Sequence, residues 1–160
     1  MKKTFLVILN VIGICMLVLS CSKKPDIGYT PTYKMAGEWF IELFEDGSQA
    51  TDFHKIISYN TSDPNSNQVW VDDLNLWPFK SKLNIDYQSL AFTPMEGAPN
   101  TKEAGETVKV IEGKVIPQGG HSKAGNIVDS IYLKIEFSDD PGTIYELKGH
   151  ARTGFLEDEY

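Results

Sequence analysis

The sequence is poor in cysteine, with Cys15 and Cys21 as its only two. Both lie in the first 21 residues, so the rest of the chain can form neither a disulfide nor a thiolate metal site. Cysteine-based catalysis and redox chemistry are excluded there for the same reason. Residues 21–160 are nevertheless long enough to form one domain with a hydrophobic core.

Positive charge is also scarce, because 15 lysines and arginines stand against 22 aspartates and glutamates, and Arg152 is the only arginine. Without the first twenty residues, 13 basic residues remain against the same 22 acidic ones, a formal charge of −9. An acidic domain is a poor candidate for binding nucleic acid by neutralising phosphates, and an equally poor candidate for binding a membrane surface through basic residues. We therefore expect no nucleic-acid partner.

The common catalytic and metal-binding motifs are missing. There is no Gly-x-Ser-x-Gly, His-x-His or His-Glu-x-x-His sequence. We expect His54 and His150 to be surface or partly buried strand residues, and His121 to lie in a solvated Gly-Gly-His-Ser loop. The neighbours Asp72 and Asp73 should point to opposite faces of a strand, so they form no chelate by themselves. The sequence predicts no catalytic residue, no metal and no cofactor.

The first twenty residues are typical of a signal peptide. Lys2 and Lys3 precede an apolar run from Phe5 to Leu19, which is short for a membrane-spanning helix. Val18-Leu19-Ser20-Cys21 resembles the lipobox of bacterial lipoproteins, which implies cleavage before Cys21 and attachment of palmitate-like acyl chains to it. Two or three acyl chains anchor a protein stably in a membrane. The alternatives are an uncleaved anchor helix or a plain secretory signal.

Residues 21–36 hold Pro25, Gly28 and Pro31 without any periodicity, so they are predicted to be a tether. Ser22 is not aspartate, which by the usual sorting rule favours the outer membrane. Lys23-Lys24 follow, where surface export calls for acidic residues, so a periplasm-facing position is favoured.

From Gly37 onward the dominant hydrophobic period is two, which predicts strands. Residues 79–87 alternate cleanly between apolar and polar side chains, and 127–138 do so with few exceptions. Breaks at 94–106 and 117–126 are predicted to be loops at the mouth of the fold. The expected strands are 38–45, 53–60, 68–72, 79–87, 90–93, 107–116, 127–138 and 143–153.

Eight short antiparallel strands suit either a sandwich or an up-and-down barrel. Gly37-Glu38-Trp39-Phe40 resembles the Gly-x-Trp motif of lipocalins and other calycins, in which the tryptophan closes the barrel and an arginine stacks across it. The resemblance implies that Trp39 and Arg152 close the barrel together, although a motif this short also arises by chance. The second lipocalin motif is absent. We predict an all-β fold, an eight-stranded antiparallel calycin-like barrel over residues 37–160.

The mature chain as a whole is similar to a family of calycin-like bacterial lipoproteins called lipid-binding putative hydrolases. The lipobox and five further stretches carry the resemblance: Gly37-Glu38-Trp39-Phe40, Ile57-Ser58-Tyr59-Asn60-Thr61, Val69-Trp70-Val71-Asp72, Trp77-Pro78-Phe79-Lys80-Ser81-Lys82 and Gly149-His150-Ala151-Arg152-Thr153-Gly154-Phe155. It implies a β-barrel and a lipid ligand, and it carries no catalytic residue.

Three functions remain open. The first is a membrane-anchored binder of a small hydrophobic ligand, lined by inward side chains. The second is an accessory protein that binds another envelope protein, favoured by a filled barrel with an exposed apolar patch. The third is an envelope hydrolase, which requires a cleft with a His–acid or carboxylate pair. The candidate ligand-lining residues are Tyr59, Phe79, Leu83, Tyr87, Phe92, Leu133, Phe137 and Tyr145.

Overall fold

The computed structural model describes residues 28–63, 65–74 and 76–160. The predicted signal peptide (1–20), Cys21 and residues 21–27 of the predicted tether lie outside the described residues. The elements are η1 (Tyr33–Met35), β1 (Gly37–Glu45), β2 (Ser48–Gln49), β3 (His54–Asn60), β4 (Gln68–Asp73), β5 (Lys80–Asp86), β6 (Ala91–Phe92), β7 (Met95–Pro99), β8 (Thr107–His121), β9 (Ile127–Phe137), β10 (Tyr145–Ala151) and η2 (Leu156–Asp158).

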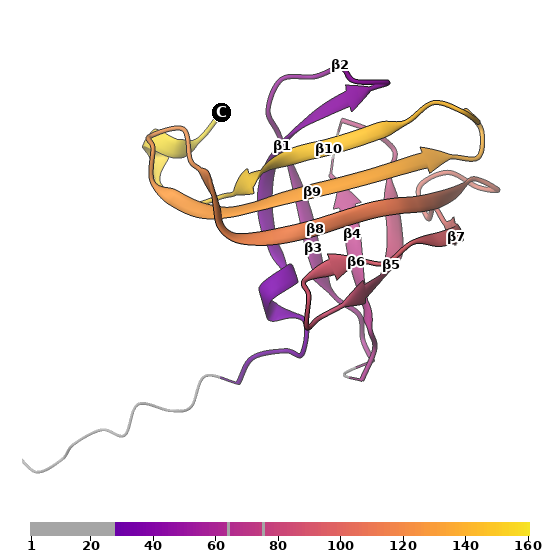
Figure 1. Ribbon diagram of the computed structural model, residues 1–160, viewed down its shortest axis with the longest axis horizontal. Coiled ribbons are helices and arrows are strands. Elements are labelled where there is room, and N and C mark those ends of the chain that lie inside the picture. The colour runs from indigo at the N-terminus through magenta and orange to yellow at the C-terminus, as the bar shows by residue number, and fades with distance from the viewer. Residues whose placement is uncertain (1–27, 64, 75) are drawn as a thin grey trace, which may run out of the picture.

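The strands form one antiparallel sheet that closes on itself (Figure 1). Its order is β10-β9-β8-β6-β5-β4-β3-β1, and β1 pairs in turn with β10. These eight strands make a closed barrel, while the short β2 and β7 pair with β1 and β8 at its edge. The predicted all-β, eight-stranded antiparallel barrel is confirmed, and each of the eight expected strands corresponds to one strand of it.

Alternation along each strand decides which side chains face the interior. In β1, Ile41 and Leu43 are buried in the core, whereas Glu38 and Glu42 face outward. Burying one such aliphatic side chain stabilises the fold by about 1.5–3 kcal/mol. The core is a single cluster contributed by all eight barrel strands. Of the described residues, none lies in a helix long and apolar enough to cross a bilayer.

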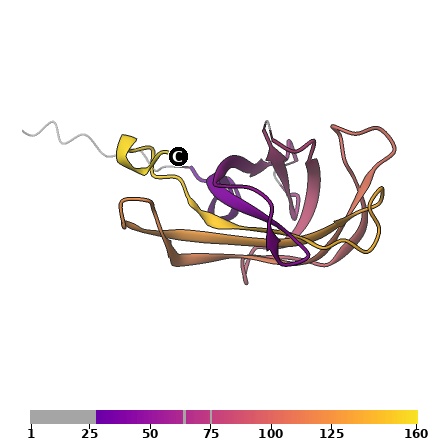
Figure 2. The same ribbon diagram turned by 90° about the horizontal axis from the view of Figure 1, so that it is seen from above.

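The structure corrects the two predicted loops. Residues 117–121 continue strand β8, which pairs with β9 as far as His121 and Ile127, with a shift of register between Ile116 and Gly120. Gln118 has a positive φ of 54° in that stretch, so the Pro- and Gly-rich sequence forms an irregularity in the strand and does not end it. Within the other predicted loop, β7 pairs with β8. Figure 2 shows the β8–β9 hairpin extending beyond the barrel wall.

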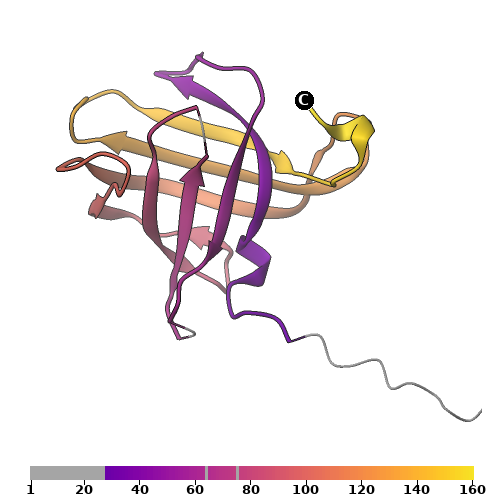
Figure 3. The ribbon, with the colours of Figure 1, turned by 180° about the vertical axis from the view of Figure 1, so that it is seen from behind.

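The barrel has two ends, which we call the tether end and the far end (Figure 3). At the tether end lie η1, the start of β1 and the β3–β4 hairpin. At the far end lie the start of β3, the end of β4 and the start of β5. The described chain begins at the tether end with Gly28, so the predicted lipid-bearing residue connects to the barrel from that side.

The C-terminal segment is fastened to the tip of the β8–β9 hairpin through Asp158. Its carboxylate accepts hydrogen bonds from the Ala124 amide (2.7 Å), the Asn126 side chain (3.1 Å) and the Thr153 hydroxyl (2.7 Å). Hydrogen bonds from Ser122 and Thr153 hold the pKa of Asp158 well below its usual range. The segment that carries the exposed Phe155 and Leu156 is therefore held in place.

Closure of the barrel depends on a close approach of β1 and β10 at Gly149, which pairs with Ile41. An added Cβ there would overlap the Phe40 carbonyl oxygen and come within 2.7 Å of Ile41 Cα. We expect Gly149→Ala to destabilise the protein by about 3 kcal/mol or more, because both obstacles are backbone atoms. Gly37→Ala is the matched control in β1, since its Cβ would meet only the Trp39 ring at 3.8 Å. Urea unfolding followed by circular dichroism measures both; equal stabilities would contradict this account of the seam.

Candidate ligand-binding site

The tether end is closed by a tryptophan that is fixed by hydrogen bonds. Trp39 is 2% exposed, and its indole N–H donates to Ser58 Oγ at 2.8 Å. The Ser58 hydroxyl donates in turn to the Met35 carbonyl in η1, at 2.7 Å. Met35 is itself fully buried in the core. This chain of hydrogen bonds holds η1 across the tether end and closes it.

Arg152 does not stack on Trp39 as the motif implied. Trp39 pairs with Ala151, so the inward indole and the outward Arg152 side chain occupy opposite faces of the sheet. The Arg152 guanidinium instead bonds Glu38 Oε2 at 2.5 Å and Glu159 Oε1 at 2.6 Å. The Arg152 amide also donates to the Glu38 carbonyl, which extends the β1–β10 seam by one residue pair.

The far end is closed by a second tryptophan, Trp77, which is held differently. Its ring packs against Phe137 and Tyr145, with centroid distances of 6.0 and 5.3 Å. Within the described part of the chain, no side chain or carbonyl accepts a hydrogen bond from its indole N–H. Trp77 precedes β5 in a segment without regular secondary structure. The packing of the Trp77 ring alone is easier to disrupt than the closure around Trp39, which combines packing with hydrogen bonds.

Beneath Trp77 lies a small cavity of about 10 Å³. This is room for about one water molecule. Apolar side chains form its wall, and the carboxylate of Asp73 is the one charged group at its edge. The lining residues are Leu43, Asp73, Trp77, Phe79, Ile135, Phe137 and Leu147. An apolar pocket with one oriented polar group is the usual form of a small-molecule site.

Asp73 organises the polar side of this pocket. Its Oδ2 lies 2.9 Å from His54 Nε2, and its Oδ1 accepts the amide hydrogens of Leu76 (3.2 Å) and Trp77 (3.3 Å). Burial lowers the pKa of His54, but the hydrogen bond and the charge of Asp73 outweigh burial and raise it above 6.5. The pair therefore fixes the backbone next to Trp77 while leaving the Trp77 ring itself unbonded.

The neighbouring Asp72 points the other way, as expected from its position in a strand. Its carboxylate faces outward and pairs with Lys80 (3.0 Å) and Lys102 (2.7 Å). Burial raises the pKa of Asp72, but the two lysines outweigh it and bring the pKa below its usual range. The Lys102 ammonium also donates to the carbonyls of Asp73 and Leu74. The segment after β4 is thus fixed from both sides of the sheet. Lys102, bound to Asp72, fixes it on the outer face, and the Asp73 carboxylate fixes it from inside the barrel.

A hydroxyl completes the array around His54, since Thr51 Oγ1 lies 3.3 Å from His54 Nδ1. Hydroxyl, imidazole and carboxylate are the components of a hydrolytic triad. However, the Asp52 carbonyl oxygen also lies 3.4 Å from His54 Nδ1, so it competes with the Thr51 hydroxyl for this nitrogen. Thr51 Oγ1 also accepts the Leu43 amide at 3.0 Å, which ties it to the backbone. The array links the segment before β3 to the end of β4 at the far end.

The predicted ligand-lining residues fall into three groups. Most of them fill the core and pack against one another, so they enclose no ligand-sized cavity in this structure. Tyr87 is partly buried at the edge of the core. The structure places Tyr59 on the outer face beside Trp70, because its neighbour Ser58 takes the inward position. The six core residues are Phe79, Leu83, Phe92, Leu133, Phe137 and Tyr145, of which Phe79 and Phe137 reach the far-end cavity.

The other two histidines lie far from this site. His121 is exposed on the β8–β9 hairpin. His150 is buried on the outer face of β10, where its Nε2 lies 3.1 Å from the Tyr160 hydroxyl. The side chain of His150 also packs beside Phe40 and Phe53. No described residues bring three or more His, Cys, Asp or Glu side chains together as a metal site.

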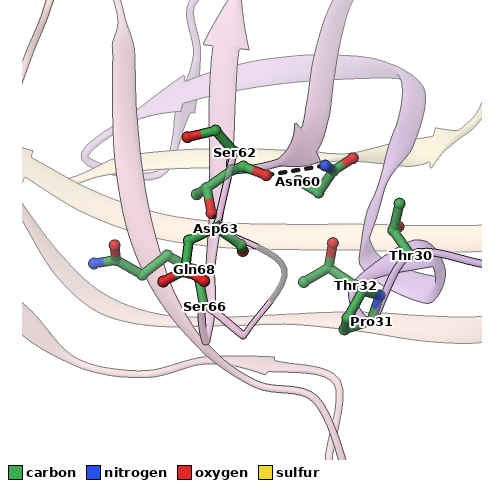
Figure 4. A pocket seen from close by; sticks show the side chains of 9 residues that line it. Thr30, Pro31, Thr32, Asn60, Ser62, Asp63, Ser66 and Gln68 are labelled. Carbon is green, nitrogen blue, oxygen red and sulfur yellow. Dashed lines mark hydrogen bonds between the residues drawn. The ribbon is translucent and has the colours of Figure 1, made fainter.

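A second pocket, at the tether end, has a volume of about 160 Å³ (Figure 4). It lies between the chain before η1 and the β3–β4 hairpin; most of its lining residues carry hydroxyl, amide or carboxylate groups, but the surface that they present to the pocket is mostly apolar. Asp63 is already engaged there, because its Oδ1 accepts the Asn65 amide at 2.9 Å. The lining residues of the pocket are Thr30, Pro31, Thr32, Asn60, Thr61, Ser62, Asp63, Ser66 and Gln68.

Several residues of the far-end site escaped the sequence analysis. Leu43, Ile135 and Leu147 look like ordinary core residues, and Trp77 lies just before a predicted strand. One signal could have found the site, because inward residues at the same end of neighbouring antiparallel strands must meet. His54 at the start of β3 and Asp73 at the end of β4 satisfy that condition.

Together, these features define a class: a small closed antiparallel β-barrel with a filled interior and an apolar, aromatic-capped end. Residues 24–156 match the family model described as lipid-binding putative hydrolase, so the chain belongs to this family. The match confirms the resemblance seen in the sequence motifs. No curated protein matches the chain.

The His54–Asp73 pair should make stability depend on pH. A histidine with a raised pKa stabilises the fold fully below its unfolded value of about 6.5, and this contribution disappears as the pH rises through the higher folded pKa. We expect the melting temperature of wild type to fall relative to His54→Gln as the pH rises above about 6.5. His121→Gln is the control on an exposed histidine. Parallel wild-type and His54→Gln curves in a thermal melt would show that the pair contributes nothing.

Proposed function

We propose that the protein is a membrane-anchored lipoprotein of the cell envelope whose barrel binds an apolar, lipid-like ligand at the far end. The family description and the apolar lining of the far end support a hydrophobic ligand. The observation that carries the proposal is the way Trp77 closes this pocket, by ring packing and without a side-chain hydrogen bond in the described structure.

The filled interior limits how a ligand is held. A cavity of about 10 Å³ is far smaller than the roughly 300–1,000 Å³ of ordinary ligand pockets. A ligand therefore enters by displacing the Trp77 side chain, which uncovers the rings of Phe137 and Tyr145. The space vacated by an aromatic ring suits the end of one apolar chain and leaves most of a lipid outside. Leu76 is 53% exposed beside Trp77 and extends the apolar surface outward.

Binding should come from the apolar part of the ligand. The charged groups nearest the cavity are already paired, Asp73 with His54 and Asp72 with two lysines. A ligand head group would have to break these pairs to gain contacts of its own, at a cost comparable to its gain. Burial of apolar surface contributes about 25 cal/mol per Å² without such a cost. The polar end of the ligand then remains in solvent.

The anchor and the orientation follow from the lipobox-like sequence at Cys21. The described chain begins at the tether end, so a lipid on Cys21 attaches that end of the barrel to the membrane and leaves the far end facing away. Ser22 and the following lysines support the periplasmic face of the outer membrane. In this position the far end is free to exchange ligand with the surrounding compartment.

The ligand site can be tested with a cysteine placed at the far end. Leu76→Cys carries an environment-sensitive fluorophore, and dodecanoic acid is added below its micelle concentration. We expect a saturable blue shift, because the ligand chain excludes water around the label. The introduced thiol is the only reactive one in the processed chain, since Cys15 and Cys21 are the only native cysteines.

Tyr59→Cys is the control on the barrel wall, because Tyr59 lies on the outer face of β3, where it is partly exposed. No saturable response is expected there. Equal responses at both positions would indicate nonspecific binding, and a silent Leu76→Cys label would refute the far-end site.

The anchor can be tested by comparing the two native cysteines. We expect Cys21→Ala to remain unprocessed and without lipid, because the acylated sulfur is lost, whereas Cys15→Ala should be cleaved and acylated like wild type. Intact-mass spectrometry of the protein from membrane extracts measures both. Normal lipid mass on Cys21→Ala would contradict the proposed modification.

A second candidate function is the binding of another envelope protein. A filled barrel and exposed apolar side chains at the C-terminal segment and the adjoining hairpin favour it. Ile127, Phe155 and Leu156 are 67%, 60% and 91% exposed, and Asp158 holds the last two near the hairpin tip. A silent far-end label together with normal lipid at Cys21 would favour this alternative.

A further inference from the structure

Three tyrosines gather at the tether end, where the described chain begins. We call Tyr29, Tyr33 and Tyr87 the tyrosine cluster. The rings of Tyr29 and Tyr33 stack with centroids 4.3 Å apart, and Tyr87 follows at 6.3 Å from Tyr33. Lys34 Nζ lies 5.9 Å from the centre of the Tyr33 ring. Tyr29 and Tyr33 remain 62% and 41% exposed, so the cluster presents aromatic surface to its surroundings.

Exposed tyrosines beside a lysine are typical of contact with a membrane–water interface. A tyrosine ring is apolar while its hydroxyl forms hydrogen bonds, so it suits the level of the lipid head groups. Lysine keeps its ammonium near phosphate while its stem lies along apolar groups. On the surface of an acidic protein, such a group of side chains has no obvious role in water.

The tyrosine cluster lies close to Cys21 in the sequence, which indicates that its partner is the membrane. Tyr29 lies eight positions after Cys21, and a fully extended chain spans at most roughly 28 Å over eight such steps. A lipid on Cys21 would therefore keep the cluster within this distance of the bilayer at all times. Confinement of this kind raises the effective concentration of a weak contact, so each tyrosine need contribute little.

The geometry points to a membrane contact: we propose that the tyrosine cluster rests in the head-group region of the bilayer that holds the Cys21 lipid. This inference rests on the anchoring proposed above. It sets the tether end on the membrane and gives the barrel one orientation, with the Trp77 pocket directed away from the surface.

The tyrosine rings, and not the net charge of the tether end, stabilise the proposed contact with the membrane. Lys34 supplies one positive charge beside the cluster, and Lys23-Lys24 precede it in the sequence. Asp63 and Asp86 lie at the same end of the barrel and oppose an anionic surface. We therefore expect the contact to persist on zwitterionic lipid and to change little with salt.

The test uses the full lipidated chain in nanodiscs of phosphatidylcholine. Thr30→Cys places a fluorophore on an exposed residue between Tyr29 and Tyr33, and a spin label near the lipid head group serves as quencher. Leu76→Cys is the matched control at the far end. We expect at least threefold stronger quenching at Thr30→Cys. Adding Tyr29→Ser and Tyr33→Ser should halve that quenching or reduce it further, without changing the melting temperature by more than a few degrees, because both side chains are exposed.

The outcomes separate the contact from the anchor. Intact mass without lipid on Cys21 overturns both proposals. A lipidated chain with equal quenching at Thr30→Cys and Leu76→Cys overturns the contact alone, as does quenching that the serine substitutions leave unchanged. Loss of Thr30→Cys quenching when a second envelope protein is added would show that the cluster binds a protein in preference to lipid, and would also overturn it.

Discussion

The pairing of β1 with β10 is the constraint on which the rest of the structure depends. These strands are the first and the last of the described chain, and their hydrogen bonds close an open sheet into a barrel. The seam also fixes the alternation of every other strand, because a slip of one residue would exchange interior and exterior. Gly149 allows the two backbones to meet closely enough for this.

The same alternation explains why neighbours in sequence have different roles. Asp72 stabilises the outer face through two lysines, while Asp73 organises the far end from within. Trp39 closes the tether end inside the barrel, and Arg152 binds two glutamates outside it. A sequence motif groups the two residues of each pair, but the sheet places their side chains on opposite faces.

A filled interior changes what kind of binding this barrel can support. Among the described residues, its aromatic and aliphatic side chains pack into one core, with a small cavity beneath Trp77. In the function proposed above, an apolar ligand is therefore recognised at the far end of the barrel and not in its middle. The two tryptophans close the two ends in different ways. The Trp39 ring is held at the tether end by a hydrogen bond, whereas the Trp77 ring is held at the far end by packing against other rings.

The sequence by itself determined the all-β class, the eight barrel strands and the family, because period-two patterning and short motifs are local properties. It also predicted that Asp72 and Asp73 would diverge. Only the tertiary structure decided that the interior is filled, that Tyr59 faces outward, that residues 117–121 continue a strand, and that His54 meets Asp73 below Trp77. Those outcomes depend on register and on the packing of side chains distant in sequence, which no local pattern encodes.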